Sequence, residues 1–158
     1  MILDLYLEPL KYKIRFIDTH LESLEREAEA SSDPDMFGIY DTSEDIKGFG
    51  FVACQKYIRS TACHYKIEIK NALDLGPKHR TGRSFVCLID GYANYWKHEG
   101  EKLHKKTKET VESIGIKVCN PYPVADGFYK MVNPQPLRFS TLLPLLKEWR
   151  DEVRRKAQ

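Results

Sequence analysis

Apolar residues recur at steps of three and four along much of this chain, which is the spacing of an amphipathic helix. The first stripe lies within about residues 8–30 and consists of Leu10, Ile14, Ile17, Leu21, Leu24 and Ala28. Residues at these steps share one face of a helix and can bury that face together. Pro9 suits a first helical turn, where a missing N–H costs nothing. We therefore expect a long helix, ended by the loop at residues 31–35.

Residues 47–54 read KGFGFVAC and allow two interpretations. Seven of the eight positions fit the signature of an RNA-recognition strand, and Cys54 replaces its last aromatic residue. Such a strand should end and turn after about six residues. However, neither Gly nor Pro occurs between Phe51 and Leu75. An RNA-recognition sheet therefore stays an alternative, with a helix as the favoured interpretation.

The favoured helix begins near Ile46, because apolar residues continue from there at steps of three and four as far as Ile69. Thr42 is its expected N-cap, and Gly76 and Pro77 close the segment. On this interpretation Phe49 belongs to the core. The two glycines of the octamer, Gly48 and Gly50, then mark either close helix contacts or a local weakness.

Three further helices are predicted downstream. One begins after Gly82, with Ser84 or Thr81 as its cap, and the others cover about residues 101–114 and 141–156. Residues 116–138 contain four prolines and no clear period, so we expect an irregular segment that packs on the body or forms a lid. Together these patterns predict an all-α bundle of about five helices in a single domain, residues 1–158.

Composition narrows the class of protein only slightly. The net charge of +2 does not indicate nucleic acid, so any site for a polyanion must come from local clustering. The four cysteines form no C-x-x-C pair, and we expect reduced thiols, mostly in the core, of a cytoplasmic protein. No apolar run approaches the roughly 20 residues that span a bilayer, and the N-terminus lacks the pattern of a signal peptide.

Two familiar motifs fail on their spacing. Residues 76–84, GPKHRTGRS, place the second glycine of a phosphate loop one residue late and have Arg83 where the lysine should be. Arg80 and Arg83 could still bind a phosphate, although a solvated basic loop is the simpler interpretation. His98 and His104 do not form the H-E-x-x-H pattern, and no other histidine has a second ligand at metal spacing. We predict no metal and no cofactor.

Asn94 and His98 are the candidate chemical pair. At about 100° per residue they share one helix face with Cys87 and Gly91, opposite the apolar stripe. That face is either plain solvent surface or a second interface, where Gly91 allows another helix to approach. In the second case the pair lies in a cleft rimmed by Lys97.

The segment Asn94-Tyr-Trp-Lys-His98 resembles the N-x-x-x-H part of the HEPN (higher eukaryotes and prokaryotes nucleotide-binding) domains. These are small all-α bundles, many of them dimeric, and many are metal-independent ribonucleases of toxin–antitoxin or anti-phage systems. Ala93 occupies the place of the arginine in the family motif. A second match to the R-x4-H spacing runs from Arg59 to His64, and these two point about 140° apart on a continuous helix.

The resemblance implies RNA cleavage with His98 as the acid–base group and Asn94 as its hydrogen-bonding neighbour. The cation that stabilises the phosphorane must then come from elsewhere. Asn94 could instead hydrogen-bond the phosphate. The expected RNA- and phosphate-binding residues are Lys97, Arg80, Arg83, Arg59 and His64. The implied partners are RNA, a second copy in a homodimer, and an antitoxin or defence protein. Two alternatives stay open: a catalytically inactive RNA- or protein-binding module, and a purely structural Asn94–His98 pair.

Overall fold

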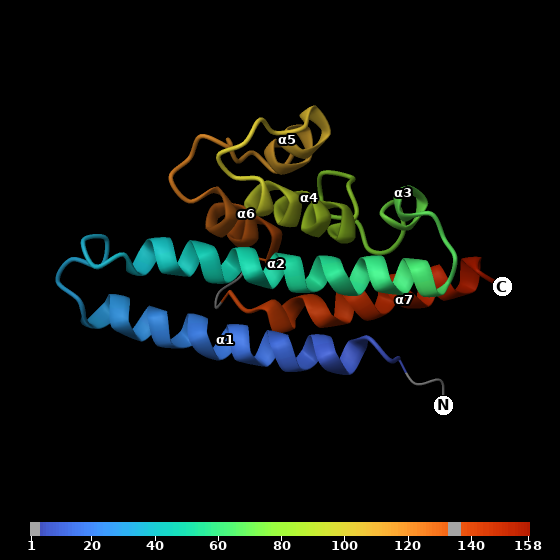
Figure 1. Ribbon diagram of the computed structural model, residues 1–158, viewed down its shortest axis with the longest axis horizontal. Helices are drawn as coiled ribbons and strands as arrows, with labels where there is room; N and C mark the ends of the chain where they lie inside the picture. Colours follow the sequence, from blue (N-terminus) through green and yellow to red (C-terminus); the bar gives the residue numbers. More distant parts are fainter. Residues whose placement is uncertain (1–3, 133–136) are drawn as a thin grey trace.

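A computed structural model describes residues 4–132 and 137–158 of the chain (Figure 1). Within these ranges it contains seven α-helices, one 3-10 helix and no strand. The all-α prediction is confirmed. The elements are α1 (Leu7–Ala30), α2 (Ile39–His64), α3 (Ile69–Ala72), α4 (Phe85–Lys97), α5 (Lys105–Glu112), α6 (Pro123–Val132), η1 (Phe139–Leu142) and α7 (Leu143–Lys156).

The long helices α1 and α2 lie side by side, and α2 is the centre of the fold (Figure 1). Helices α4, α6 and α5 lie beyond α2 on the side away from α1. The apolar stripe of α1 packs as predicted, with Leu10, Ile14 and Leu21 almost fully buried. Most of the buried apolar side chains of the described residues form one cluster that all the long helices share. No helix in the described ranges combines the length and apolar character needed to cross a bilayer.

Helix α2 begins earlier and ends earlier than the sequence pattern predicts. Its N-cap is Gly38, whose φ of 66° suits glycine, and Thr42 lies inside the first turn with its hydroxyl donating to the Gly38 carbonyl. It ends at His64, because Lys66 takes a φ of 55° and turns the chain. The octamer KGFGFVAC lies within α2, so the interpretation as a recognition strand is wrong.

Gly48 and Gly50 of the octamer mark close contacts, which is the first of the two roles predicted for them. A Cβ on Gly48 would lie 2.2 Å from the Trp96 ring, and one on Gly50 would lie 2.3 Å from the Phe139 ring. The Phe49 ring meets the edge of Trp96 at the surface and remains 51% exposed. Its predicted place in the core is therefore wrong, because the two glycines, not Phe49, carry the buried side of this turn.

The prediction of an irregular segment at residues 116–138 is wrong for residues 123–132, which form α6. Pro123 lies in the first turn, where proline is tolerated, and Val124, Phe128 and Met131 bury one face. The carboxylate of Glu44 in α2 accepts hydrogen bonds from Val124 N and Ala125 N, each at 2.7 Å. Pro134 and Pro136 lie outside the described residues.

The other helix ends differ by a few residues from the predicted ones. Ser84, one of the two predicted N-caps, caps α4, and its hydroxyl accepts a hydrogen bond from Cys87 N at 3.0 Å. Helix α5 is shorter than predicted, and a 3-10 turn precedes α7. Of the four free cysteines only Cys54 is buried, and Cys63 and Cys119 are exposed. The expectation of mostly buried thiols is therefore wrong, because Cys63 lies on the exposed side of the last turn of α2 and Cys119 lies between α5 and α6.

Candidate functional site

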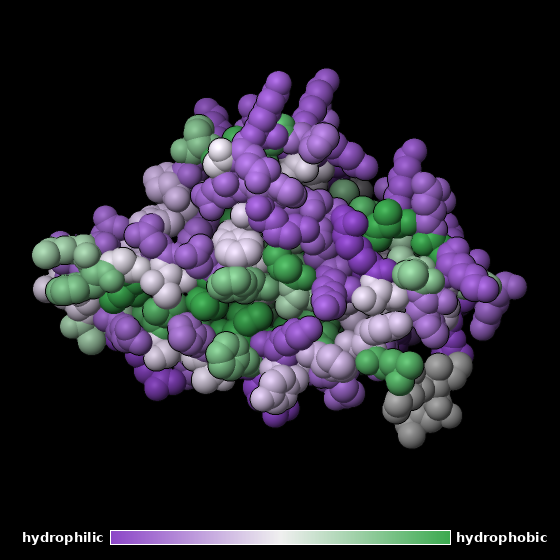
Figure 2. Space-filling model, in the orientation of Figure 1, coloured by the Kyte–Doolittle hydropathy of each residue, from purple (hydrophilic) through white to green (hydrophobic). Residues whose placement is uncertain are grey.

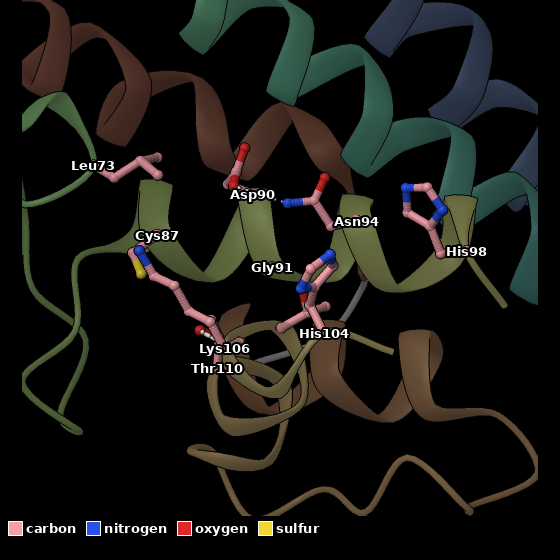
Figure 3. Close-up of a pocket in the computed structure, with 10 residues that line it drawn as sticks. Leu73, Cys87, Asp90, Gly91, Asn94, His98, His104, Lys106 and Thr110 are labelled. Carbon is pink, nitrogen blue, oxygen red and sulfur yellow. Dashed lines mark hydrogen bonds between the residues drawn. The ribbon is translucent and has the colours of Figure 1, made fainter. Parts of the chain in front are cut away.

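A cleft of about 350 Å³ lies between α4 and α5 (Figure 3). Its lining residues are Leu73, Cys87, Asp90, Gly91, Asn94, His98, His104, Lys106, Thr107 and Thr110. Gly91 allows α5 to approach, because a Cβ at this position would lie 2.5 Å from Thr110 Cγ2. Of the two interpretations of the Gly91 face, the structure has the second interface. Asn94 and His98 line the cleft that results, whereas the predicted rim residue Lys97 does not, because it turns toward Gln55 of α2.

Asp90 is the centre of a polar cluster where α4 packs on α2. It is only 7% exposed, and its Oδ1 accepts from Gln55 Nε2 at 2.8 Å and from the Arg59 guanidinium at 2.8 Å. Asn94 Nδ2 donates to the other carboxylate oxygen at 3.0 Å, and Asn94 Oδ1 accepts from Gln55 Nε2 at 2.9 Å. Both ends of the Asn94 amide are therefore held by protein groups rather than by His98.

Two cations lie on the α2 side of this cluster. Lys97 Nζ donates to Gln55 Oε1 at 2.7 Å, and Arg59 is paired with Asp90. Partial burial lowers the pKa of Lys97, and the positive charge of Arg59 lowers it further. The negative charge of Asp90 opposes both effects on the Lys97 pKa, so the repulsion between the two cations is already partly compensated.

His98 is the C-cap of α4, and its side chain is 55% exposed. Its Nδ1 lies 3.0 Å from Glu101 Oε2, a contact that favours one orientation of the ring and leaves Nε2 as the nitrogen available for proton transfer. His104 is the N-cap residue of α5 and lines the same cleft. Figure 3 shows both imidazoles at the end of the cleft where Asn94 lies, with Lys106 extending toward Cys87 at the other end.

The remaining predicted site residues lie elsewhere. Arg80 and Arg83 belong to the loop before α4, where His79 N donates to the Arg83 carbonyl at 2.8 Å, and neither arginine lines the cleft. His64 ends α2 and packs edge-on against Tyr6 and Tyr65. Arg59, five residues before His64, faces Asp90. The structure thus brings Asn94, His98, Lys97 and Arg59 to one region, without Arg80, Arg83 and His64.

Ala93, at the place of the family arginine, is fully buried. A long cation at this position would point into the core, so in this fold a guanidinium at the cleft has to come from another helix. Arg59 of α2 is the one that approaches, since it reaches Asp90 across the helix contact. Arg59 does not line the cleft itself, and its guanidinium is held by the Asp90 carboxylate.

Sequence reasoning missed four residues of this region: Gln55, Asp90, His104 and Lys106. Asp90 had a signal, because it precedes Asn94 by one helical turn and shares its face. The others had none, since Gln55 enters through the packing of α2 on α4, and His104 and Lys106 enter because α5 folds back over Gly91.

Among the described residues, no three His, Cys, Asp or Glu side chains gather as metal ligands would. The cleft instead combines two imidazoles, an amide and an ammonium group, which can exchange protons and bind the oxygens of a phosphate. In comparisons with known proteins, no family model, curated protein or solved structure matches the chain. Its function therefore has to be inferred from the chemistry of this cleft.

Proposed function

We propose that the protein is a HEPN-like endoribonuclease that cleaves single-stranded RNA in the α4–α5 cleft without a metal ion. The observation that carries this proposal is that His98 and His104 line one cleft. Transesterification of RNA needs one group to remove a proton and a second to supply one. Imidazole is the side chain suited to both steps near neutral pH.

In the proposed reaction, His98 removes the proton of the ribose 2′-OH, and the oxygen attacks the adjacent phosphorus. Glu101, 3.0 Å from Nδ1, stabilises the imidazolium that forms. The bond from phosphorus to the 5′-oxygen breaks, and His104 protonates the departing oxygen. The products are a 2′,3′-cyclic phosphate and a 5′-hydroxyl, so atoms, protons and charge balance without a co-reactant.

The cations have separate parts in this proposal. Lys106 lines the end of the cleft away from the imidazoles and would bind a neighbouring phosphate of the strand. Lys97 and Arg59 would bind the phosphate backbone on the α2 side. Because both ends of its amide are engaged by Asp90 and Gln55, Asn94 acts as a positioning residue rather than as a partner of His98.

A second candidate, binding of RNA without cleavage, is favoured by the ion pair between Arg59 and Asp90 at 2.8 Å. A carboxylate that already neutralises the guanidinium leaves less positive charge for a transition state. The other implications of the resemblance, namely a homodimer, an antitoxin or defence partner and a cytoplasmic location, stay predictions under either candidate.

The test is incubation of the purified protein with a labelled single-stranded RNA in the presence of EDTA, with the DNA of the same sequence as control. We expect RNA fragments that end in 2′,3′-cyclic phosphate and an intact DNA, because DNA lacks the attacking hydroxyl. RNA that is bound but stays intact with and without divalent metal would select the binding module. Cleavage that requires a divalent metal would contradict the proposed chemistry.

A further inference from the structure

Phe49 is an exposed aromatic side chain close to the candidate site. It is 51% exposed on α2, and its ring meets that of Trp96 edge to face, with 4.7 Å between the centroids and 60° between the planes. The face drawn in Figure 2 has hydrophobic side chains exposed over α1 and α2, with hydrophilic ones around them. Leaving such a ring in water is unfavourable, so its exposure calls for an explanation.

The two rings form a fixed surface. Gly48 lies directly beneath Trp96, since a Cβ there would be 2.2 Å from the indole ring. The indole Nε1 donates to Asp45 Oδ1 at 3.3 Å, which sets the plane of the ring. A ligand that stacks here finds rings already ordered and so loses little side-chain entropy on binding.

This aromatic pair, formed by Phe49 and Trp96, is continuous with the candidate site. Trp96, Lys97 and His98 are consecutive at the end of α4. The Lys97 ammonium contacts Gln55, which in turn holds Asn94 at the edge of the cleft. The two rings and the Lys97 ammonium therefore lie where the end of α4 packs on α2, next to the cleft that His98 lines.

We propose that the aromatic pair is a stacking platform for an unpaired base of RNA, while Lys97 binds the phosphate that joins this base to the nucleotide in the cleft. This inference rests on the proposed function and names its substrate as single-stranded RNA. Aromatic side chains next to cations are the usual arrangement for binding bases in single strands. The Asp45 carboxylate beside the indole repels phosphate, so the base, not the backbone, meets the rings.

A duplex cannot bind to the aromatic pair in this way, because its bases stack on one another and are not free to stack on a side chain. The platform therefore predicts discrimination between single and double strands. A different occupant, a second copy of this chain that covers Phe49, predicts self-association that depends on the same residue. These two outcomes can be separated by measurement.

The experiment measures binding of a fluorescein-labelled 2′-O-methyl oligoadenylate, which cannot be cleaved because its 2′-oxygens are blocked. We expect Phe49→Ala to weaken binding by about 5- to 150-fold, the range for losing one stacked base. The slope of log affinity against log salt should not change, because no phosphate contact is lost. Lys97→Ala should instead reduce that slope by about 0.7, the value for one phosphate contact to a single strand.

Two variants serve as controls. Phe49→Tyr keeps an aromatic ring and should bind as the unchanged protein does. Phe37→Ala removes a similarly exposed ring, 68% exposed, from the turn before α2 and should have no effect. Phe49 is half exposed, so its replacement by Ala is compatible with folding, which circular dichroism verifies.

Equal binding by Phe49→Ala and the unchanged protein would overturn the platform and leave the proposed cleavage standing. Equal affinity for the duplex would also overturn it. A dimer that dissociates in Phe49→Ala while RNA affinity is kept would show that the patch contacts a second copy, and would overturn it too. Binding that depends on Phe49 without cleavage of normal RNA would support the platform and reject the nuclease. Neither binding nor cleavage would reject both.

Discussion

Two carboxylates, Glu44 in α2 and Asp90 in α4, are each only 7% exposed, but they hold different kinds of partner. Glu44 accepts from the backbone N–H groups of Val124 and Ala125 at the start of α6. Asp90 accepts from the side chains of Gln55, Asn94 and Arg59. A buried carboxylate is costly unless such bonds satisfy it, so both arrangements need a reason.

The difference in partners indicates the difference in role. Glu44 satisfies donors that every helix start leaves unpaired, so its bonds attach α6 to α2 and belong to the fold. The partners of Asp90 are side chains whose backbone is already satisfied within helices, so apolar residues could replace the whole set without loss of fold. A polar cluster that the fold does not require, at the edge of a cleft with two imidazoles, is expected at a functional site.

The largest expected effect is on catalysis. We expect His98→Ala and His104→Ala each to reduce RNA cleavage about 100- to 10,000-fold, the usual contribution of a general acid or base. His20→Ala, which removes an exposed imidazole from α1, should leave the rate unchanged and is the matched control. Cleavage rates under single-turnover conditions test this. Full activity in either cleft variant would remove that imidazole from the mechanism.

Replacing each carboxylate by alanine should separate stability from activity: Glu44→Ala should mainly lower stability, and Asp90→Ala should mainly lower cleavage. Glu44→Ala leaves two N–H groups of α6 without acceptors and should lower the free energy of unfolding by about 1–3 kcal/mol. Asp90→Ala should cost less stability, because Arg59 can turn into solvent, but should reduce cleavage tenfold or more. Urea unfolding and cleavage by the folded variants, measured in parallel, test this. The distinction between the two carboxylates fails if both variants lose stability and activity alike.

Two buried glycines extend the same comparison. Gly50→Ala would force the Phe139 ring away and should cost about 1–3 kcal/mol of stability, with the cleft unchanged. Gly91→Ala would instead push Thr110 and α5 outward, so RNA binding should weaken together with stability. Thermal unfolding and RNA affinity separate the two. A Gly91→Ala protein with normal RNA binding would show that the α4–α5 spacing is not critical.

The smallest effect expected is a pH dependence from Glu44. Burial raises the pKa of Glu44 from its ordinary value of 4.5 to about 6. Between these values the unfolded chain loses its proton first, so the free energy of unfolding falls as the pH rises, by at most about 2 kcal/mol. Glu44→Gln has no proton to lose and should not show this component. Stability curves of both proteins from pH 4 to 7 test this, and parallel curves would contradict it.

Much of the fold follows from spacing that sequence reasoning can read. The stripe of α1 and the cap of α4 lie where the pattern predicts them, because each depends on residues close in sequence. Helix α6 was missed because its prolines indicated a loop, while its N-terminal acceptor is Glu44, about eighty positions earlier. Contacts over such a distance leave no local pattern.

The candidate site was predictable in part for the same reason. Asn94 and His98 share a helix face, which the 100° step reveals. His104 and Gln55 join them only through the packing of α5 and α2 on α4. The expectation that Phe49 lies in the core was wrong for a similar reason, because the sequence does not show that Gly48 and Gly50 face the neighbouring helices. In both cases the missing information is the direction from which a second helix approaches.

The most direct test of the central claim is NMR of the five histidine side chains during titration with a nucleoside 3′-monophosphate. The imidazole resonances of His98 and His104 should shift together with one affinity, because both rings line the α4–α5 cleft. Those of His20, His64 and His79, which do not line it, should stay in place. Shifts confined to the second group, or none at the two cleft histidines, would contradict the assignment of this cleft as the RNA site.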